Sequence, residues 1–157
     1  MLYPTAAKRV IDVDDGENSP VKLHICTSTS KEKAKYTTLS YCWGGDQPIK
    51  ATMETISSYT NSIPTDRLSK TLSDAIKVTW RTGTRFLWVD ALCIVQDSPK
   101  DKLEQIANMG LIYKQATYTI VAASAETVSE GFLSNSKPDH VMAKLPFCLG
   151  EQFEGEI

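Results

Sequence analysis

The chain has 157 residues, a length that fits one domain able to bury a hydrophobic core without disulfides or bound metal ions. Hydrophobic residues make up 41% and charged residues 23%, which indicates a soluble globular protein and excludes a disordered or fibrous chain. The net charge of -2, without a dense run of lysine or arginine, excludes the basic surface that binds nucleic acid or an anionic membrane.

No apolar stretch approaches the roughly 20 residues of a membrane-spanning helix, and residues 1–10 lack the apolar centre of a signal peptide. We therefore expect a cytoplasmic protein. The four cysteines contain no C-x-x-C pair and only two histidines are present, so neither a zinc site nor a disulfide framework is expected. Cys42 and Cys93 lie in apolar runs, which favours a buried core position for both over a reactive thiol.

The N-terminal part of the chain predicts β structure. Apolar and polar residues alternate over residues 9–13 and again over 21–25, with turn-forming residues between them, which is the pattern of a β-hairpin. After a polar stretch, residues 36–43 predict another strand, which ends at Gly44 and Gly45.

The middle of the chain predicts helices. Residues 52–59 carry apolar residues at helical spacing, which predicts a short helix. A stronger apolar stripe begins at Leu68 and ends before Gly83. Thr71 and Asp74 are spaced as in a capping box near the start of this second helix.

The following part alternates between strand and helix patterns. Residues 86–95 contain two apolar runs, typical of a strand that is covered on both faces in the centre of a sheet. Ser98 followed by Pro99 predicts the start of a helix that ends near residues 114–115. Residues 118–123 predict another buried strand. The core-facing stripe expected for the helix consists of Leu103, Ile106, Ala107, Gly110 and Tyr113 or Lys114.

This order of strands and helices predicts an α/β fold, with a small flavodoxin-like parallel sheet, right-handed crossovers and flanking helices. Residues 1–35 are expected to form the N-terminal hairpin and a linker that belong to the domain. Residues 36–133 are expected to form its core, and residues 134–157 a C-terminal extension that leads into a longer protein.

Four sequence blocks resemble the motifs of the HET (heterokaryon incompatibility) domain family of fungi, in the same order and at matching spacing. The resemblance extends from about Arg9 to Leu133. It implies a domain that acts in non-self recognition and triggers programmed cell death, within a larger protein. The blocks are LSYCWG at 39–44, LSDAI at 72–76, RFLWVDALCIVQD at 85–97 and IYKQATYTIVAA at 112–123.

The HET family has in turn been likened to TIR domains, so the resemblance implies a TIR-like fold. Some TIR domains cleave NAD with a glutamate on a helix, and others are adaptors that oligomerise without catalysis. The chain lacks the Trp-Cys-x-x-Glu type of helix start that carries this glutamate after residues 118–123. The TIR likeness therefore implies self-association and NAD as a candidate substrate, with no tightly bound cofactor, and leaves both activities open.

Ligands of open parallel sheets bind beyond the carboxyl ends of the strands. Here this location gathers Trp43 and the two glycines after it, Asp90, and residues 124–130. Trp43 could stack on a base while the bare backbone of Gly44 and Gly45 approaches a phosphate, or it could be a core aromatic residue before a turn. The candidate nucleotide-binding residues are Tyr41, Trp43, Gly44, Gly45 and Asp101.

A carboxylate is the group that would stabilise the positive ribose formed when the bond to nicotinamide breaks. Glu104 is the first candidate for this role, with Asp90 and Asp97 beside it, and Asp101 shares a helix face with Glu104. Each has a structural alternative, because Asp101 could cap the helix and Glu104 could be a solvated acid. Asp90 and Asp97 could cap turns or pair with Arg85.

Overall fold

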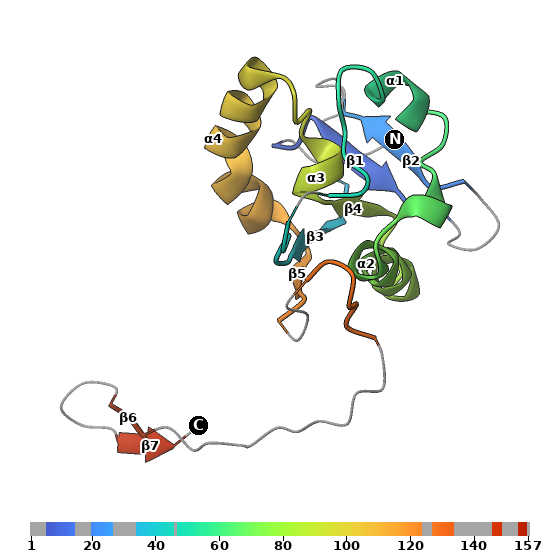
Figure 1. Ribbon diagram of the computed structural model, residues 1–157. Coiled ribbons are helices and arrows are strands. Elements are labelled where there is room, and N and C mark those ends of the chain that lie inside the picture. Colours follow the sequence, from blue (N-terminus) through green and yellow to red (C-terminus); the bar gives the residue numbers. More distant parts are fainter. Residues whose placement is uncertain are drawn as a thin grey trace.

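The computed structural model of the chain describes residues 6–14, 20–26, 34–45, 47–123 and 127–133, together with the backbone of 146–148 and 154–156. One five-stranded sheet forms the centre of the fold, in the order β2-β1-β4-β3-β5 (Figure 1). This architecture confirms the predicted α/β class. The strands are β1 (Arg9–Asp12), β2 (Lys22–Ile25), β3 (Tyr36–Ser40), β4 (Phe86–Trp88) and β5 (Tyr118–Val121).

Strand β3 lies between β4 and β5 and is parallel to both, as predicted for a parallel core. The N-terminal hairpin also forms as predicted, and its strand β1 pairs antiparallel with β4 through Ile11 and Leu87. The sheet is therefore mixed. A separate antiparallel pair is formed by β6 (Pro146–Cys148) and β7 (Glu154–Glu156), and the rest of the expected extension over 134–157 lies outside the described residues.

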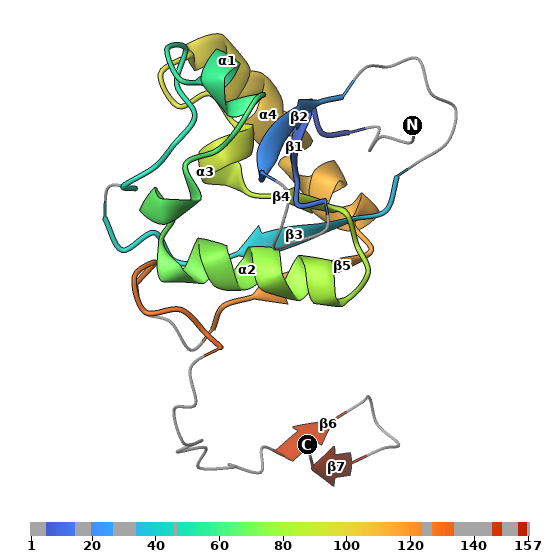
Figure 2. The ribbon, with the colours of Figure 1, turned by 90° about the vertical axis from the view of Figure 1, so that its right-hand side faces the viewer.

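Helices cover both faces of the sheet (Figure 2). On β3, Thr37 bonds to Thr79 of one helix, while the hydroxyl of the neighbouring Tyr36 donates to the carbonyl of Ile112 on another. Because successive side chains of a strand point to opposite faces, these two helices lie on opposite sides of the sheet. The helical segments are α1 (Ile56–Tyr59), η1 (Thr65–Arg67), α2 (Lys70–Arg81), α3 (Asp90–Cys93) and α4 (Pro99–Gln115).

The predicted start is confirmed for one of the two long helices, and the predicted cap is wrong for the other. The hydroxyl of Ser98 accepts from the backbone N–H of Asp101 with Pro99 in the first turn, so the start of α4 is confirmed. Helix α2 is capped by Ser69, and the predicted capping box of Thr71 and Asp74 is wrong. These two side chains instead accept backbone N–H groups of residues 131–133, far along the chain.

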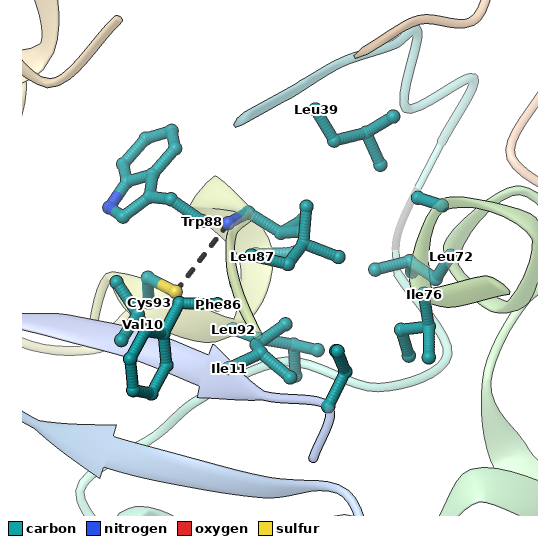
Figure 3. Packing of buried hydrophobic residues seen from close by; sticks show 14 of the residues in the cluster. Val10, Ile11, Leu39, Leu72, Ile76, Phe86, Leu87, Trp88, Leu92 and Cys93 are labelled. Atoms are coloured by element: carbon teal, nitrogen blue, oxygen red, sulfur yellow. Dashed lines mark hydrogen bonds between the residues drawn. The ribbon is translucent and has the colours of Figure 1, made fainter. Parts of the chain in front are cut away.

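Strand β4 lies in the centre of the sheet, as predicted, but it ends at Trp88. The prediction that Leu92–Val95 continues this strand is wrong, because Asp90–Cys93 form the short helix α3. The apolar side chains of Leu92–Val95 are nevertheless buried, in this helix and just after it, so the hydrophobic pattern fits either conformation. Figure 3 shows Leu92 and Cys93 packed beside Val10 and Ile11 of β1.

Helix α4 turns a different face to the sheet from the one predicted. Gln105 and Ile112 are buried, whereas Leu103 and Ile106 of the predicted core stripe are exposed. The stripe prediction is confirmed for Tyr113, which packs on the core together with Met109, Ile112 and Ala116 of a second apolar face. It is wrong for the other four residues, Leu103, Ile106, Ala107 and Gly110, which are exposed. Tyr113 makes an edge-on contact with Trp88 at 5.7 Å between ring centroids.

Two further predictions of burial are wrong. Strand β5 lies at the edge of the sheet, so Thr119 and Val121 are exposed. Cys42 is exposed just after the end of β3, whereas Cys93 is buried as predicted.

Candidate functional site

The carboxyl ends of the central strands meet at a contact between Trp43 and Asp90. Trp43 follows β3 and Asp90 follows β4, and the two strands are parallel neighbours. The indole Nε1–H of Trp43 donates a 3.0 Å hydrogen bond to Oδ2 of Asp90. Topology therefore brings these two predicted residues together, as expected for strand ends at one edge of a sheet.

Asp90 is a partly buried carboxylate. Its Oδ1 accepts a 2.7 Å hydrogen bond from the backbone N–H of Ala91. Burial raises the pKa of Asp90 above its ordinary value, although the hydrogen bonds from Ala91 and Trp43 oppose the rise. The predicted alternative pairing with Arg85 is wrong, because Arg85 forms a two-pronged ion pair with Asp12, with both bonds at 2.9 Å.

Tyr41 lies beside Asp90 and stays protonated. Burial and the neighbouring carboxylate raise the pKa of its hydroxyl far above the ordinary value. The hydroxyl also donates to Oε1 of Gln47 at 3.4 Å, and Nε2 of Gln47 donates to the carbonyl of Trp43 at 3.2 Å. Gln47 is buried, and it fixes the turn that follows Trp43.

The glycines after Trp43 have separate roles. Gly44 has φ +65°, and a Cβ atom placed there would lie 3.1 Å from the side chain of Thr127. A bare backbone is therefore required at this close approach. Gly45 has φ +148° with nothing within 4 Å of its Cβ position. The approach of Thr127 confirms that the segment after β5 reaches this edge, although residues 124–126 of the predicted segment lie outside the described part.

Asp97 is exposed and contacts the loop that precedes α1. Its Oδ1 accepts a 2.9 Å hydrogen bond from the backbone N–H of Met53. The neighbouring Gln96 donates through Nε2 to the carbonyl of Asp90, and its backbone N–H donates to Ala51 at 2.8 Å. These bonds attach the segment before α1 to the end of α3 and give Asp97 an anchoring position.

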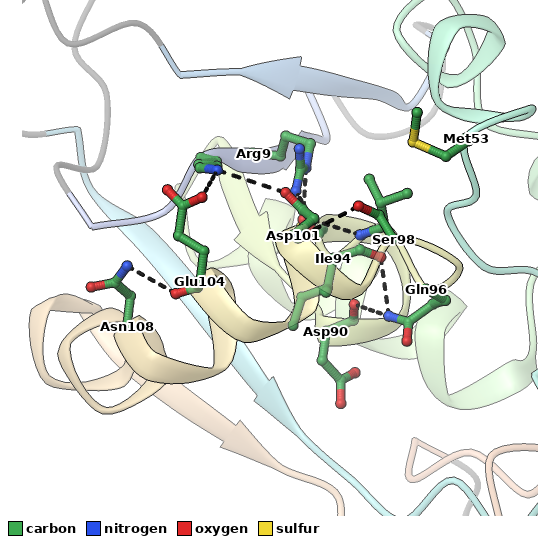
Figure 4. Close-up of polar contacts among 12 residues, drawn as sticks. Arg9, Met53, Asp90, Ile94, Gln96, Ser98, Asp101, Glu104 and Asn108 are labelled. Carbon is green, nitrogen blue, oxygen red and sulfur yellow. Dashed lines mark hydrogen bonds and ion pairs between the residues drawn. The ribbon is translucent and has the colours of Figure 1, made fainter.

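Asp101 and Glu104 share one face of α4, as predicted, and that face lies against the N-terminal segment. Asp101 accepts hydrogen bonds from Arg9 and from the backbone N–H of Val95. Burial would raise the pKa of Asp101, but the bonds from Arg9 and Val95 lower it below its ordinary value. Glu104 is 45% exposed and pairs with Nζ of Lys8 at 2.5 Å. Figure 4 shows the Asp90 carboxyl group pointing away from both residues.

The structure thus places most of the predicted residues in two groups, while Asp97 lies apart in its contact with Met53. Tyr41, Trp43, Gly44 and Asp90 gather at the carboxyl edge of the sheet, where an aromatic ring, a carboxylate and a bare backbone lie together. Asp101 and Glu104 lie against the hairpin. Thr127 belongs to the segment 124–130 that was expected at this edge. Gln47 was not predicted, since an isolated polar residue in a loop carries no signal for a contact with Tyr41.

Within the described residues, no group of three or more histidine, cysteine, aspartate or glutamate side chains is placed to hold a metal ion. In the same part of the chain, every helix is too short or too polar to cross a bilayer.

No curated protein and no solved structure matches the chain. The sequence pattern of a family described as "Heterokaryon incompatibility protein (HET)" matches residues 36–147, well over half of the 157 residues. The match includes all the residues gathered at the carboxyl edge of the sheet. The chain therefore belongs to the heterokaryon incompatibility (HET) family.

Proposed function

We propose that this HET domain is an effector of fungal non-self recognition that triggers programmed cell death by cleaving NAD at the carboxyl edge of its sheet. The observation that carries the proposal is the hydrogen bond between Trp43 and Asp90. It holds an aromatic ring next to a partly buried carboxylate, at the position where open α/β sheets bind ligands.

The three groups at this edge match three parts of a dinucleotide. The half-buried ring of Trp43 offers a stacking surface, and the exposed backbone of Gly45, with nothing within 4 Å of its Cβ position, admits a phosphate. The carboxylate of Asp90 accepts hydrogen bonds from the indole of Trp43 and from the backbone N–H of Ala91. An ionised carboxylate has about four acceptor positions, so Asp90 can accept a further bond from a ribose hydroxyl group.

The chemistry requires one bond to break and one to form. The bond between the ribose C1′ and the nicotinamide nitrogen breaks, and nicotinamide leaves as a neutral molecule with the bonding electrons. Positive charge develops on the ribose, and a water molecule then adds its oxygen to C1′ and releases a proton. Asp90 is the carboxylate at this edge that can stabilise the developing charge.

The test is nicotinamide release by the purified chain at high concentration. We expect Asp90→Asn to lower turnover about 100-fold or more, since that substitution removes the charge while keeping the acceptor shape. Glu104→Gln is the matched control, because it neutralises a surface carboxylate outside the Trp43 site. Turnover that survives Asp90→Asn and disappears in Glu104→Gln would place the chemistry on α4 and contradict the proposal.

A second candidate function is a signalling module that acts by contact, without catalysis. It is favoured by the position of Glu104, the first catalytic candidate, which is solvent-exposed and paired with Lys8. In this case the purified chain would release no nicotinamide at any concentration. Expression in fungal cells would still cause death when Asp90 is replaced by asparagine.

A further inference from the structure

The outer face of α4 carries an apolar surface that the described part of the domain does not cover. Leu103, Ile106 and Leu111 are 76%, 55% and 46% exposed, respectively, and Ala107 and Gly110 are exposed between them. Scattered apolar residues on a surface are ordinary, whereas these residues lie side by side at helical spacing and form one continuous stripe. We name these five residues the outer α4 stripe.

Gly110 has no function within the described chain. A Cβ atom at this position would have nothing within 4 Å, and the residue lies inside a regular helix. Glycine in a helix interior destabilises the helix relative to alanine. A small residue is useful here if another helix packs across the stripe, because bare backbone allows two helix axes to approach closely.

The stripe is complementary to itself when two copies run antiparallel. A two-fold axis between Asn108 and Met109 pairs every stripe position with another apolar position or with the aliphatic stem of a lysine. The large residues then face large ones, and the small residues meet at the crossing point. The opposing pairs are Leu103 with Lys114, Ile106 with Leu111, and Ala107 with Gly110.

The charges on α4 agree with this arrangement. No charged residue lies between Glu104 and Lys114, so the centre of the stripe brings no like charges together. The antiparallel orientation also carries Lys114 of one copy to the end of the stripe that holds Glu104 in the other. Opposite charges at the rim of an interface fix its register.

We infer that the outer α4 stripe is the surface through which two copies of this chain associate. At 1.5 Å per residue the helix is about 25 Å long, and a strip about 10 Å wide along it covers about 250 Å². A stable dimer interface buries about 800 Å² per partner. The association is therefore weak and forms when the local concentration of the domain is high.

The test is sedimentation velocity of the full chain over a range of concentrations. We expect the wild type to dimerise reversibly, and Ile106→Glu and Leu111→Lys each to weaken dimerisation at least about tenfold. Both positions are exposed, so the substitutions leave the core intact. Met53→Glu is the control, because it places the same charge on a 66% exposed apolar residue outside α4.

The decisive sample mixes Ile106→Glu with Leu111→Lys. In the antiparallel register the two new charges of opposite sign face each other, so the mixture regains dimers that neither variant forms alone. A wild type that stays monomeric at millimolar concentration overturns the inference. The inference is also overturned if the mixture forms no more dimers than the single variants, or if Met53→Glu weakens dimerisation as much as Ile106→Glu does. Asp90→Asn leaves dimerisation unchanged, so this result is separate from the result on NAD cleavage.

Discussion

The buried carboxylate of Asp74 accepts the backbone N–H of Phe132 at 2.9 Å, and the same oxygen accepts that of Leu133 at 3.0 Å. This contact joins the middle of α2 to the end of the described core, across 58 residues of sequence for the first pair. Asp74 is thus a long-range anchor for the segment that follows β5.

We expect Asp74→Ala to lower the free energy of unfolding by about 2–3 kcal/mol, because two backbone N–H groups lose their acceptor in a buried position. Urea unfolding monitored by circular dichroism measures the change. The control is Asp66→Ala, at an exposed position in η1. Equal losses in the two variants would show that the anchor contributes nothing specific.

The ion pair of Asp12 and Arg85 makes the free energy of unfolding depend on pH. Burial would raise the pKa of Asp12, but the hydrogen bond and charge of Arg85 outweigh it and hold the pKa below 3.8. The carboxylate therefore contributes stability above pH 3.8, which is lost as pH falls through the lowered value. Wild type and Asp12→Asn should differ most in unfolding free energy near neutral pH. The difference should shrink as pH falls through the lowered pKa of Asp12. A difference that stays constant with pH would contradict the pairing.

The close approach of Gly44 to Thr127 predicts a cost for any side chain. Gly44→Ala should destabilise the domain by about 1–2 kcal/mol, since a left-handed φ is unfavourable for alanine and its Cβ would crowd Thr127. Thermal unfolding measures this change. Gly44→Ala combined with Thr127→Gly tests the crowding separately, and recovery of part of the loss is expected.

At Gly110 we expect replacement by alanine to change stability in the opposite direction to that at Gly44. Gly110→Ala should stabilise the isolated domain by about 0.5–1 kcal/mol, because alanine favours the helix and the space around its Cβ is open. The measurement is urea unfolding in dilute solution, where the chain is monomeric. A loss of stability would mean that the interior of the domain, and not a partner, requires glycine there.

The elements with local signals were predictable from the sequence. Ser98 and Pro99 fix the start of α4 through short-range bonds, and the alternating residues of β1 and β2 fix the hairpin. The face of α4 was not predictable, because the helix has two apolar faces. Distant residues decide between them, including Arg9, which bonds to Asp101, and Trp88, which contacts Tyr113.

In the candidate site, too, some features could be predicted from the sequence and others depended on distant residues. The meeting of Trp43 and Asp90 could be predicted, since parallel neighbours end at one edge of a sheet. The separation of Glu104 from that edge could not, because spacing along a helix gives a shared face but not its direction. The carboxylates of Asp101 and Glu104 were placed together correctly, yet Lys8 and Arg9 occupy the face they share.

The pairing of β1 with β4 shows that the folded domain extends beyond the segment that matches the family pattern. The family pattern begins at residue 36, whereas Ile11 and Asp12 hydrogen-bond to the side of β4 opposite β3. A polypeptide trimmed to 36–147 would convert this central strand into an open edge and uncover Leu87. Such an edge attracts strands from other molecules. We therefore expect the hairpin strands β1 and β2 to protect the HET core from aggregation, although they lie before the part by which the family is identified.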